Sequence, residues 1–282
     1  MIRIEPSQKL AEKHAEAVIN RLNKQGREDA VLAEIQTLGL TDIKSFILAD
    51  IHILLDWVQS CPEKLQFTQL KDIYSKYFSN GAAKYVDGDY NAYQFLKELG
   101  ITVCPYCDDE YLDIVTIDDK KRRTSEVDHF FPKNKYPALA MCFYNLIPSG
   151  QNCNGLKLEL ELGMNPYESQ IEEKTYLYPD IPVGVLMDSI SPTECKVQFH
   201  AQDGMIKNVD LLGLEQRYER YAPEVYRLLR NLQLYSEEKI DELVRLGYGT
   251  REEIISSNFG PQNPEEKKNA LRQKMLRDLT GY

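Results

Sequence analysis

One part of this 282-residue chain carries the residue types needed to hydrolyse a phosphodiester: Asp128 and His129 are adjacent, and Asn145 and Asn154 follow. Such a reaction needs a deprotonated water, a cation on the scissile phosphate and a stabilised leaving oxygen. An imidazole accepts a proton near neutral pH, so His129 suits the role of general base. Asp128 should point to the opposite face of the same strand, where its carboxylate and the Asn154 oxygen would hold Mg²⁺ or Mn²⁺.

Asn145 and three lysines complete this candidate site. We expect Asn145 to fix the loop between strand and helix through hydrogen bonds from its side chain to the backbone. Lys157 follows Asn154 by three residues and shares its helix face, where an ammonium group could meet a phosphate. Lys133 and Lys135 are further candidates for contact with a nucleic acid. Glu126 is either an additional metal ligand or an exposed strand residue.

Three cysteines form a second candidate site, a metal knuckle. Cys104 and Cys107 make a C-x-x-C pair, and Cys153 is near the Asn154 position. Structural zinc takes four ligands, and the residue three before Cys153 is Gly150, so one place stays open. Three interpretations remain: packing alone holds the knuckle, water completes a zinc site, or a distant ligand does so, namely Cys142, Cys195 or His200.

The elements that must position these residues follow from hydrophobic spacing. Residues 7–99 have apolar side chains three and four positions apart, which is typical of amphipathic helices. Residues 111–117 and 124–131 predict two strands of a hairpin around a turn at 118–121, with the second strand carrying the Asp-His pair. Further helices are predicted over 90–99 (after a turn at 87–89), 137–145, 154–162, 214–232, 237–246 and 264–279, and a second hairpin over 196–200 and 206–209.

Composition sets outer limits on the function. The chain has no apolar run of 18 residues and no signal-like N-terminus, so we expect a cytoplasmic protein without a membrane anchor. A net charge of −10 argues against a protein that coats nucleic acid. Residues 120–157, in contrast, hold seven basic and two acidic side chains. This pattern predicts a local phosphate contact, or a partner that supplies the remaining nucleic-acid surface.

The candidate site resembles that of the HNH endonuclease family, in the pattern Asp128-His129, fifteen residues, Asn145, eight residues, Asn154. The resemblance implies an α+β, mostly helical fold in which a central ββα-metal motif with a zinc-knuckle-like C-x-x-C (100–170) lies between a helical region (1–99) and a hairpin and helical region (171–282). It also implies a general base at His129, ligands for Mg²⁺ or Mn²⁺ at Asp128 and Asn154, and products with a 5′-phosphate and a 3′-hydroxyl. The family commonly completes its zinc site with a fourth cysteine where this chain has glycine.

A longer pattern narrows the resemblance. Cys-Pro-Tyr-Cys, Val-Asp-His-Phe-Phe-Pro-Lys and Asn-Leu-Ile-Pro-Ser are similar to HNH proteins that accompany an ATPase in bacterial anti-phage systems of the Septu type. The implied function is a DNA endonuclease that acts in a defence complex with a partner ATPase. Two alternatives stay open. One is a catalytically inert scaffold that keeps the HNH fold, and the other is an RNA nuclease that cuts transfer RNA.

Overall fold

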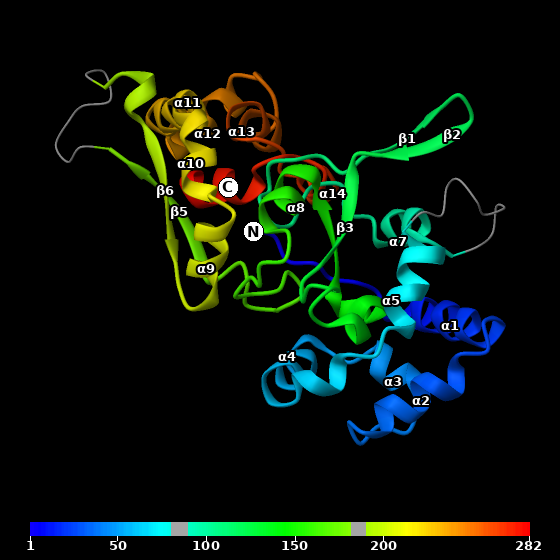
Figure 1. Cartoon of the computed structure of the whole chain (residues 1–282). Coiled ribbons are helices and arrows are strands. Elements are labelled where there is room, and N and C mark those ends of the chain that lie inside the picture. Colours follow the sequence, from blue (N-terminus) through cyan, green and yellow to red (C-terminus); the bar gives the residue numbers. More distant parts are fainter. Residues whose placement is uncertain (80–89, 182–189) are drawn as a thin grey trace.

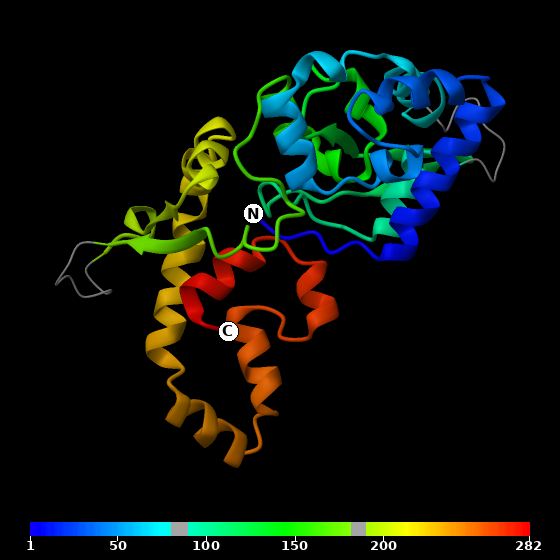
Figure 2. The same ribbon diagram turned by 90° about the horizontal axis from the view of Figure 1, so that it is seen from below.

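The computed structural model of the chain describes residues 1–79, 90–181 and 190–282. Within these residues the protein is α+β and mostly helical, as predicted, with three separate two-stranded antiparallel sheets. Figure 1 shows a central strand-and-helix unit with the N-terminal helices on one side and the C-terminal helices on the other. The N-terminus lies near the centre of the molecule, and the C-terminus lies among the C-terminal helices (Figures 1 and 2).

The N-terminal region consists of short capped helices. The Ser7 hydroxyl accepts a hydrogen bond from the Leu10 N–H at 3.2 Å and so begins α1. Asn91 caps the last helix, which ends at Gly100 (φ +69°) as predicted, whereas the turn predicted at 87–89 lies outside the described residues. The elements are α1 (Gln8–Lys24), α2 (Glu28–Gln36), α3 (Ile43–Ile47), α4 (Ile51–Ser60), a 3₁₀ turn (Pro62–Leu65), α5 (Gln69–Ile73), a π-helical turn (Tyr74–Phe78) and α7 (Ala92–Leu99).

His14 joins α1 to the central unit. Its Nε2 lies 2.9 Å from the Met141 carbonyl oxygen, and its Nδ1 lies 3.1 Å from the Tyr90 hydroxyl. The imidazole is fully buried and also contacts the rings of Phe78 and Phe143. Burial lowers the pKa of His14 to about 4, because an apolar environment disfavours the charged imidazolium.

The burial of His14 makes the stability of the protein sensitive to acid. His14 in the unfolded protein is protonated below about pH 6.5, whereas in the folded protein it is protonated only below about pH 4. The unfolded state therefore binds more protons between these values, and the protein loses stability as the pH falls through this range. We expect His14→Gln to reduce the loss of unfolding free energy between pH 7 and pH 4.5 by ~2–3 kcal/mol. Urea unfolding at both pH values measures it; an equal pH dependence in the variant would contradict the role of His14.

The central unit differs from the predicted hairpin. β1 (Ile114–Ile117) pairs with β2 (Lys120–Arg123) in a ribbon that projects from the body (Figure 1). Asp118 and Asp119 both have positive φ, which is the geometry of a two-residue hairpin turn, so the partner strand begins earlier than the predicted 124–131. The Asp-His pair instead lies on a separate strand, β3 (Ser125–His129).

β3 pairs antiparallel with β4 (Leu146–Gly150), which places Asp128 opposite Ile147. α8 (Gln151–Lys157) follows directly and packs against both strands. This helix ends at Lys157, short of the predicted 154–162, because Leu158 leaves the helical region with φ +46°. The predicted helix over 137–145 is two 3₁₀ turns, Pro137–Met141 and Phe143–Asn145.

The second predicted hairpin is wrong. β6 (Lys196–Ala201) pairs with β5 (Thr175–Asp180), whereas residues 206–209 belong to a helix. Met205, Val209 and Leu212 are buried at three- and four-residue spacing, and this periodicity outweighs the short apolar run that favoured a strand. The remaining elements are a 3₁₀ turn (Pro192–Glu194), α9 (Gly204–Leu211), α10 (Leu214–Tyr218), a 3₁₀ turn (Glu219–Tyr221), α11 (Ala222–Leu234), α12 (Glu237–Arg245), α13 (Arg251–Phe259), α14 (Pro264–Lys268) and α15 (Gln273–Thr280).

The C-terminal region docks on the knuckle through two aspartates. Asp108 Oδ2 accepts a hydrogen bond from the Lys274 N–H at 2.7 Å. The buried carboxylate of Asp109 pairs with Arg220 at 2.7 Å and with Arg272 at 3.1 Å. Figure 2 shows the orange helices of this region extending away from the N-terminal helices. In the described parts of the chain, we find no helix with both the length and the apolar character that a membrane crossing requires.

Candidate functional site

Three of the predicted catalytic side chains border one pocket. Asp128 and His129 of β3 and Asn154 of α8 line an open cavity with a volume of about 260 Å³. Tyr74, from the π-helical turn, and Glu126 also line it. The pairing of β3 with β4 and the packing of α8 on both strands bring Asn154 close to Asp128 and His129.

His129 is held in one tautomer. Its Nε2 lies 3.1 Å from the carbonyl oxygen of Ala140, which can only accept, so Nε2 carries the proton and Nδ1 keeps a lone pair. The Tyr74 ring packs edge-on against the imidazole with centroids 4.3 Å apart. Burial, together with the nearby Lys133 ammonium, holds the pKa of His129 well below its usual value. The imidazole is thus neutral at pH 7, with Nδ1 unprotonated.

Asp128 is fixed by two buried partners. The Tyr106 hydroxyl donates to Asp128 Oδ2 at 2.7 Å. Lys157 Nζ lies 3.1 Å from Oδ2 and 3.3 Å from Oδ1 of the same carboxylate, and it donates to the His129 carbonyl oxygen at 2.6 Å. The Lys157 side chain is 0% exposed. The expectation that its ammonium meets a phosphate does not match this position, because all of its observed partners lie inside the protein.

Asn145 lies behind the pocket. Its Oδ1 accepts from the Phe131 N–H at 2.7 Å, and its Nδ2 donates to the carbonyl oxygens of Phe131 at 3.2 Å and Leu139 at 2.9 Å. Asn145 thereby fixes both ends of the loop that joins β3 to β4. The same loop supplies Ala140, so Asn145 also positions the carbonyl that orients His129.

The two other lysines lie in different environments. Lys133 lines the pocket, and its ammonium is 5.4 Å from the centre of the Tyr74 ring. Partial burial lowers the pKa of Lys133. Lys135 is exposed and pairs with Glu161 at 2.5 Å, so it lies outside the residues that line the pocket. Only Lys133 of these two is placed to meet a ligand bound beside His129.

The oxygen donors at the pocket suit a hard cation. Asp128 offers a carboxylate and Asn154 an amide oxygen, which is the donor chemistry that Mg²⁺ and Mn²⁺ prefer. Mg²⁺ commonly uses one or two protein ligands and keeps several waters, so this small donor set fits it. Glu126 borders the same pocket and stays open as a further donor.

The three knuckle cysteines come together as predicted. The Sγ atoms of Cys104, Cys107 and Cys153 all lie within 4.8 Å of one another, and all three residues are buried. Among the described residues, no other histidine, cysteine or acidic side chain has a ligand atom within 4.8 Å of all three sulfurs. Cys142 instead contacts the Phe46 carbonyl oxygen at 3.5 Å. Cys142, Cys195 and His200, the distant ligands considered from the sequence, do not lie in this group in the structure.

Sequence reasoning missed two side chains that shape the pocket. Tyr106 lies between the knuckle cysteines, and an aromatic residue inside a C-x-x-C pair was a usable signal for a buried contact. Tyr74 comes from the N-terminal region, where it donates a hydrogen bond to the Val127 carbonyl oxygen at 2.9 Å. No local pattern connects it with the Asp-His pair, because the contact depends on how two distant segments pack.

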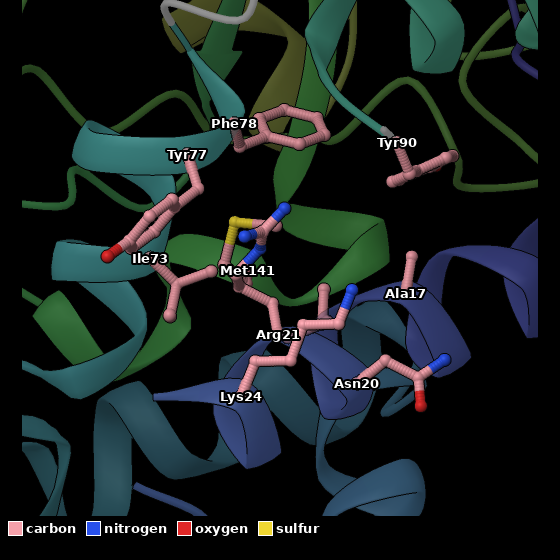
Figure 3. A pocket seen from close by; sticks show the side chains of 10 residues that line it. Ala17, Asn20, Arg21, Lys24, Ile73, Tyr77, Phe78, Tyr90 and Met141 are labelled. Carbon is pink, nitrogen blue, oxygen red and sulfur yellow. The ribbon is translucent and has the colours of Figure 1, made fainter. Parts of the chain in front are cut away.

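Another pocket, of about 200 Å³, lies between α1 and the π-helical turn (Figure 3). It is lined by Arg21, Lys24, Tyr77 and Met141 among others, and Arg21 packs over the Tyr77 ring at 4.8 Å. None of its lining residues belongs to the His129 pocket. The residues predicted to be catalytic therefore lie elsewhere.

The fold and site define an α+β protein in which a strand-strand-helix unit carries an open pocket lined by Asp128, His129 and Asn154, together with a cluster of three buried cysteines. Over 62 residues the chain is 37% identical to the Septu protein PtuB of Bacillus thuringiensis. The match covers 22% of this chain and 21% of that protein, so it spans about a fifth of each. No family model matches the chain, and no solved structure does.

Proposed function

We propose that this protein is a metal-dependent HNH-type endonuclease that hydrolyses DNA phosphodiesters in bacterial anti-phage defence. The observation that most supports it is the state of His129. Its Nε2–H donates to the Ala140 carbonyl oxygen, its ring is neutral, and the residue lines a pocket that Asp128 and Asn154 also line. A neutral, oriented imidazole is what a general base for water requires.

The other residues orient this base and a cation. Tyr106 and Lys157 fix the direction of the Asp128 carboxylate, and Asn145 fixes the loop that holds Ala140. Asp128 and Asn154 would hold Mg²⁺ or Mn²⁺, which when bound neutralises phosphate charge and makes water a better nucleophile. Lys133, at the edge of the same pocket, is the lysine best placed to attract a phosphate.

The biological context rests on the partial similarity to the Septu protein. That match supports a role in defence against phage, and the resemblance of the motifs adds an ATPase as partner. A net charge of −10 leaves little of the surface suited to DNA, so the partner would supply much of the binding.

The direct test is a cleavage assay. Purified protein, alone and with the proposed ATPase partner, is incubated with plasmid DNA and with transfer RNA in Mg²⁺, in Mn²⁺ and in a chelator. We expect nicking of the plasmid that requires the divalent cation. Cleavage confined to transfer RNA would instead make the protein an RNA nuclease, and intact plasmid and RNA in every mixture would favour an inert scaffold.

A further inference from the structure

The carboxylate of Glu110 lies beside Gly150, in the space that a side chain at this position would occupy. A Cβ atom built on Gly150 would lie 2.1 Å from both Cδ and Oε2 of Glu110. No real Cβ could occupy that position unless Glu110 moved, so the carboxylate fills the space that a side chain at 150 would take. Gly150 precedes Cys153 by three residues at the start of α8. A side chain at residue 150 would therefore begin about one helical turn before Cys153.

The carboxylate of Glu110 has too few hydrogen-bond donors for a group that is partly buried. Its Oε2 is buried and accepts no hydrogen bond from any residue that the structure describes. Its Oε1 has one long contact, 3.5 Å from the Asn152 N–H. A buried carboxylate oxygen without a donor is costly unless a cation balances it. The backbone holds it beside the cluster, because the Glu110 carbonyl oxygen accepts from the Cys104 N–H at 2.9 Å.

We propose that Glu110 is the fourth ligand of a zinc ion held by Cys104, Cys107 and Cys153. Structural zinc is tetrahedral and accepts sulfur and carboxylate oxygen together, at about 2.3 Å and 2.0–2.2 Å. The Glu110 oxygens lie outside the 4.8 Å grouping of the sulfurs, so binding needs a rotation of this side chain about its own bonds.

One nearby arginine partly balances the charge of this donor set. Three thiolates and one carboxylate carry more negative charge than one Zn²⁺ neutralises. Arg217 offsets part of the excess, because its Nη1 lies 3.3 Å from the Cys153 sulfur. Donors of this kind around a metal site orient the ligands and tune their affinity. The proposal does not depend on nuclease activity, since metal affinity and coordination are its readouts.

The first experiment measures zinc affinity by competition with a chelator. We expect about one zinc per chain in the wild type and a loss of affinity of at least about tenfold in Glu110→Gln, which keeps the size of the side chain. Glu16→Gln makes the same change at an exposed site on α1 and should leave affinity unchanged. Absence of bound zinc in the wild type with excess Zn²⁺ would overturn the proposal.

The second experiment identifies the ligand atoms. X-ray absorption of the zinc-loaded wild type should show three sulfurs and one oxygen, and Glu110→Gln should change the oxygen shell. The double variant Glu110→Gln/Gly150→Cys should recover the lost affinity and show four sulfurs, because Gly150 has an ordinary φ of −71° and the new side chain replaces the carboxylate. An unchanged spectrum and unchanged affinity in Glu110→Gln would show that water, not Glu110, is the fourth ligand.

Discussion

His129→Ala is expected to lower the rate of metal-dependent DNA cleavage by about 10²–10⁴-fold, the usual contribution of a positioned general base. The loss should appear in the single-turnover rate, with little effect on DNA binding, because the imidazole acts on water. His129→Gln sharpens the test, since an amide N–H can still donate to Ala140 but has no basic nitrogen. Both variants should lose activity to a similar extent.

The matched control is His52→Ala, which removes an exposed imidazole from α4 and should retain full activity. Circular dichroism and an unfolding curve for each variant separate loss of chemistry from loss of fold. Cleavage by well-folded His129→Ala at the wild-type rate would remove His129 from the mechanism. Cleavage lost in both His52 and His129 variants would point to a general effect on the protein.

Lys157→Met is expected to lower the free energy of unfolding by about 3–5 kcal/mol. Methionine approximates the length of lysine but leaves the Asp128 carboxylate, which is 5% exposed, without its ionic partner. An isolated buried charge is far less favourable than either the pair or two neutral groups. Urea unfolding of the wild type and the variant measures the difference.

A double-mutant cycle tests whether the pair itself is responsible. Asp128→Asn combined with Lys157→Met removes both charges, so the double variant should be more stable than Lys157→Met alone. Lys135→Met breaks the exposed pair with Glu161 and should change stability by less than about 1 kcal/mol. Equal, small losses in Lys157→Met and Lys135→Met would contradict the buried ion pair.

The candidate site could be predicted largely because its residues are close in the sequence. Asp128, His129 and Asn154 belong to one continuous strand-loop-strand-helix segment, so local spacing was enough to place them together. Their catalytic roles stay predictions until activity is measured. Lys157 shows the limit of such reasoning. Helical spacing assigned it to the face of Asn154, but spacing does not tell whether that position faces solvent or the buried side of Asp128.

Helices could be predicted where apolar residues repeat at helical spacing over several turns, whereas short apolar runs did not distinguish a helix from a strand. The spacing of its apolar residues predicts α1, and the capping residues Asn91 and Gly100 predict the helix between them. The sequence of residues 206–209 predicts a strand, and this prediction is wrong because four residues do not distinguish a buried strand from a buried helix. The contact of Tyr74 with His129 required tertiary packing, and no single-sequence pattern encodes it.

The docking of the C-terminal region on the knuckle has a consequence for protein synthesis. Asp108 and its partner Lys274 are 166 residues apart, and Asp109 is 163 residues from Arg272. At about 5–20 residues per second, a ribosome adds that length in roughly ten to thirty seconds. Between the synthesis of Cys153 and that of Lys274, the nascent chain contains all three knuckle cysteines but lacks the residues that contact Asp108 and Asp109. We therefore expect the knuckle to receive its C-terminal contacts only late in translation, whereas every residue that lines the His129 pocket, from Tyr74 to Glu159, is made well before.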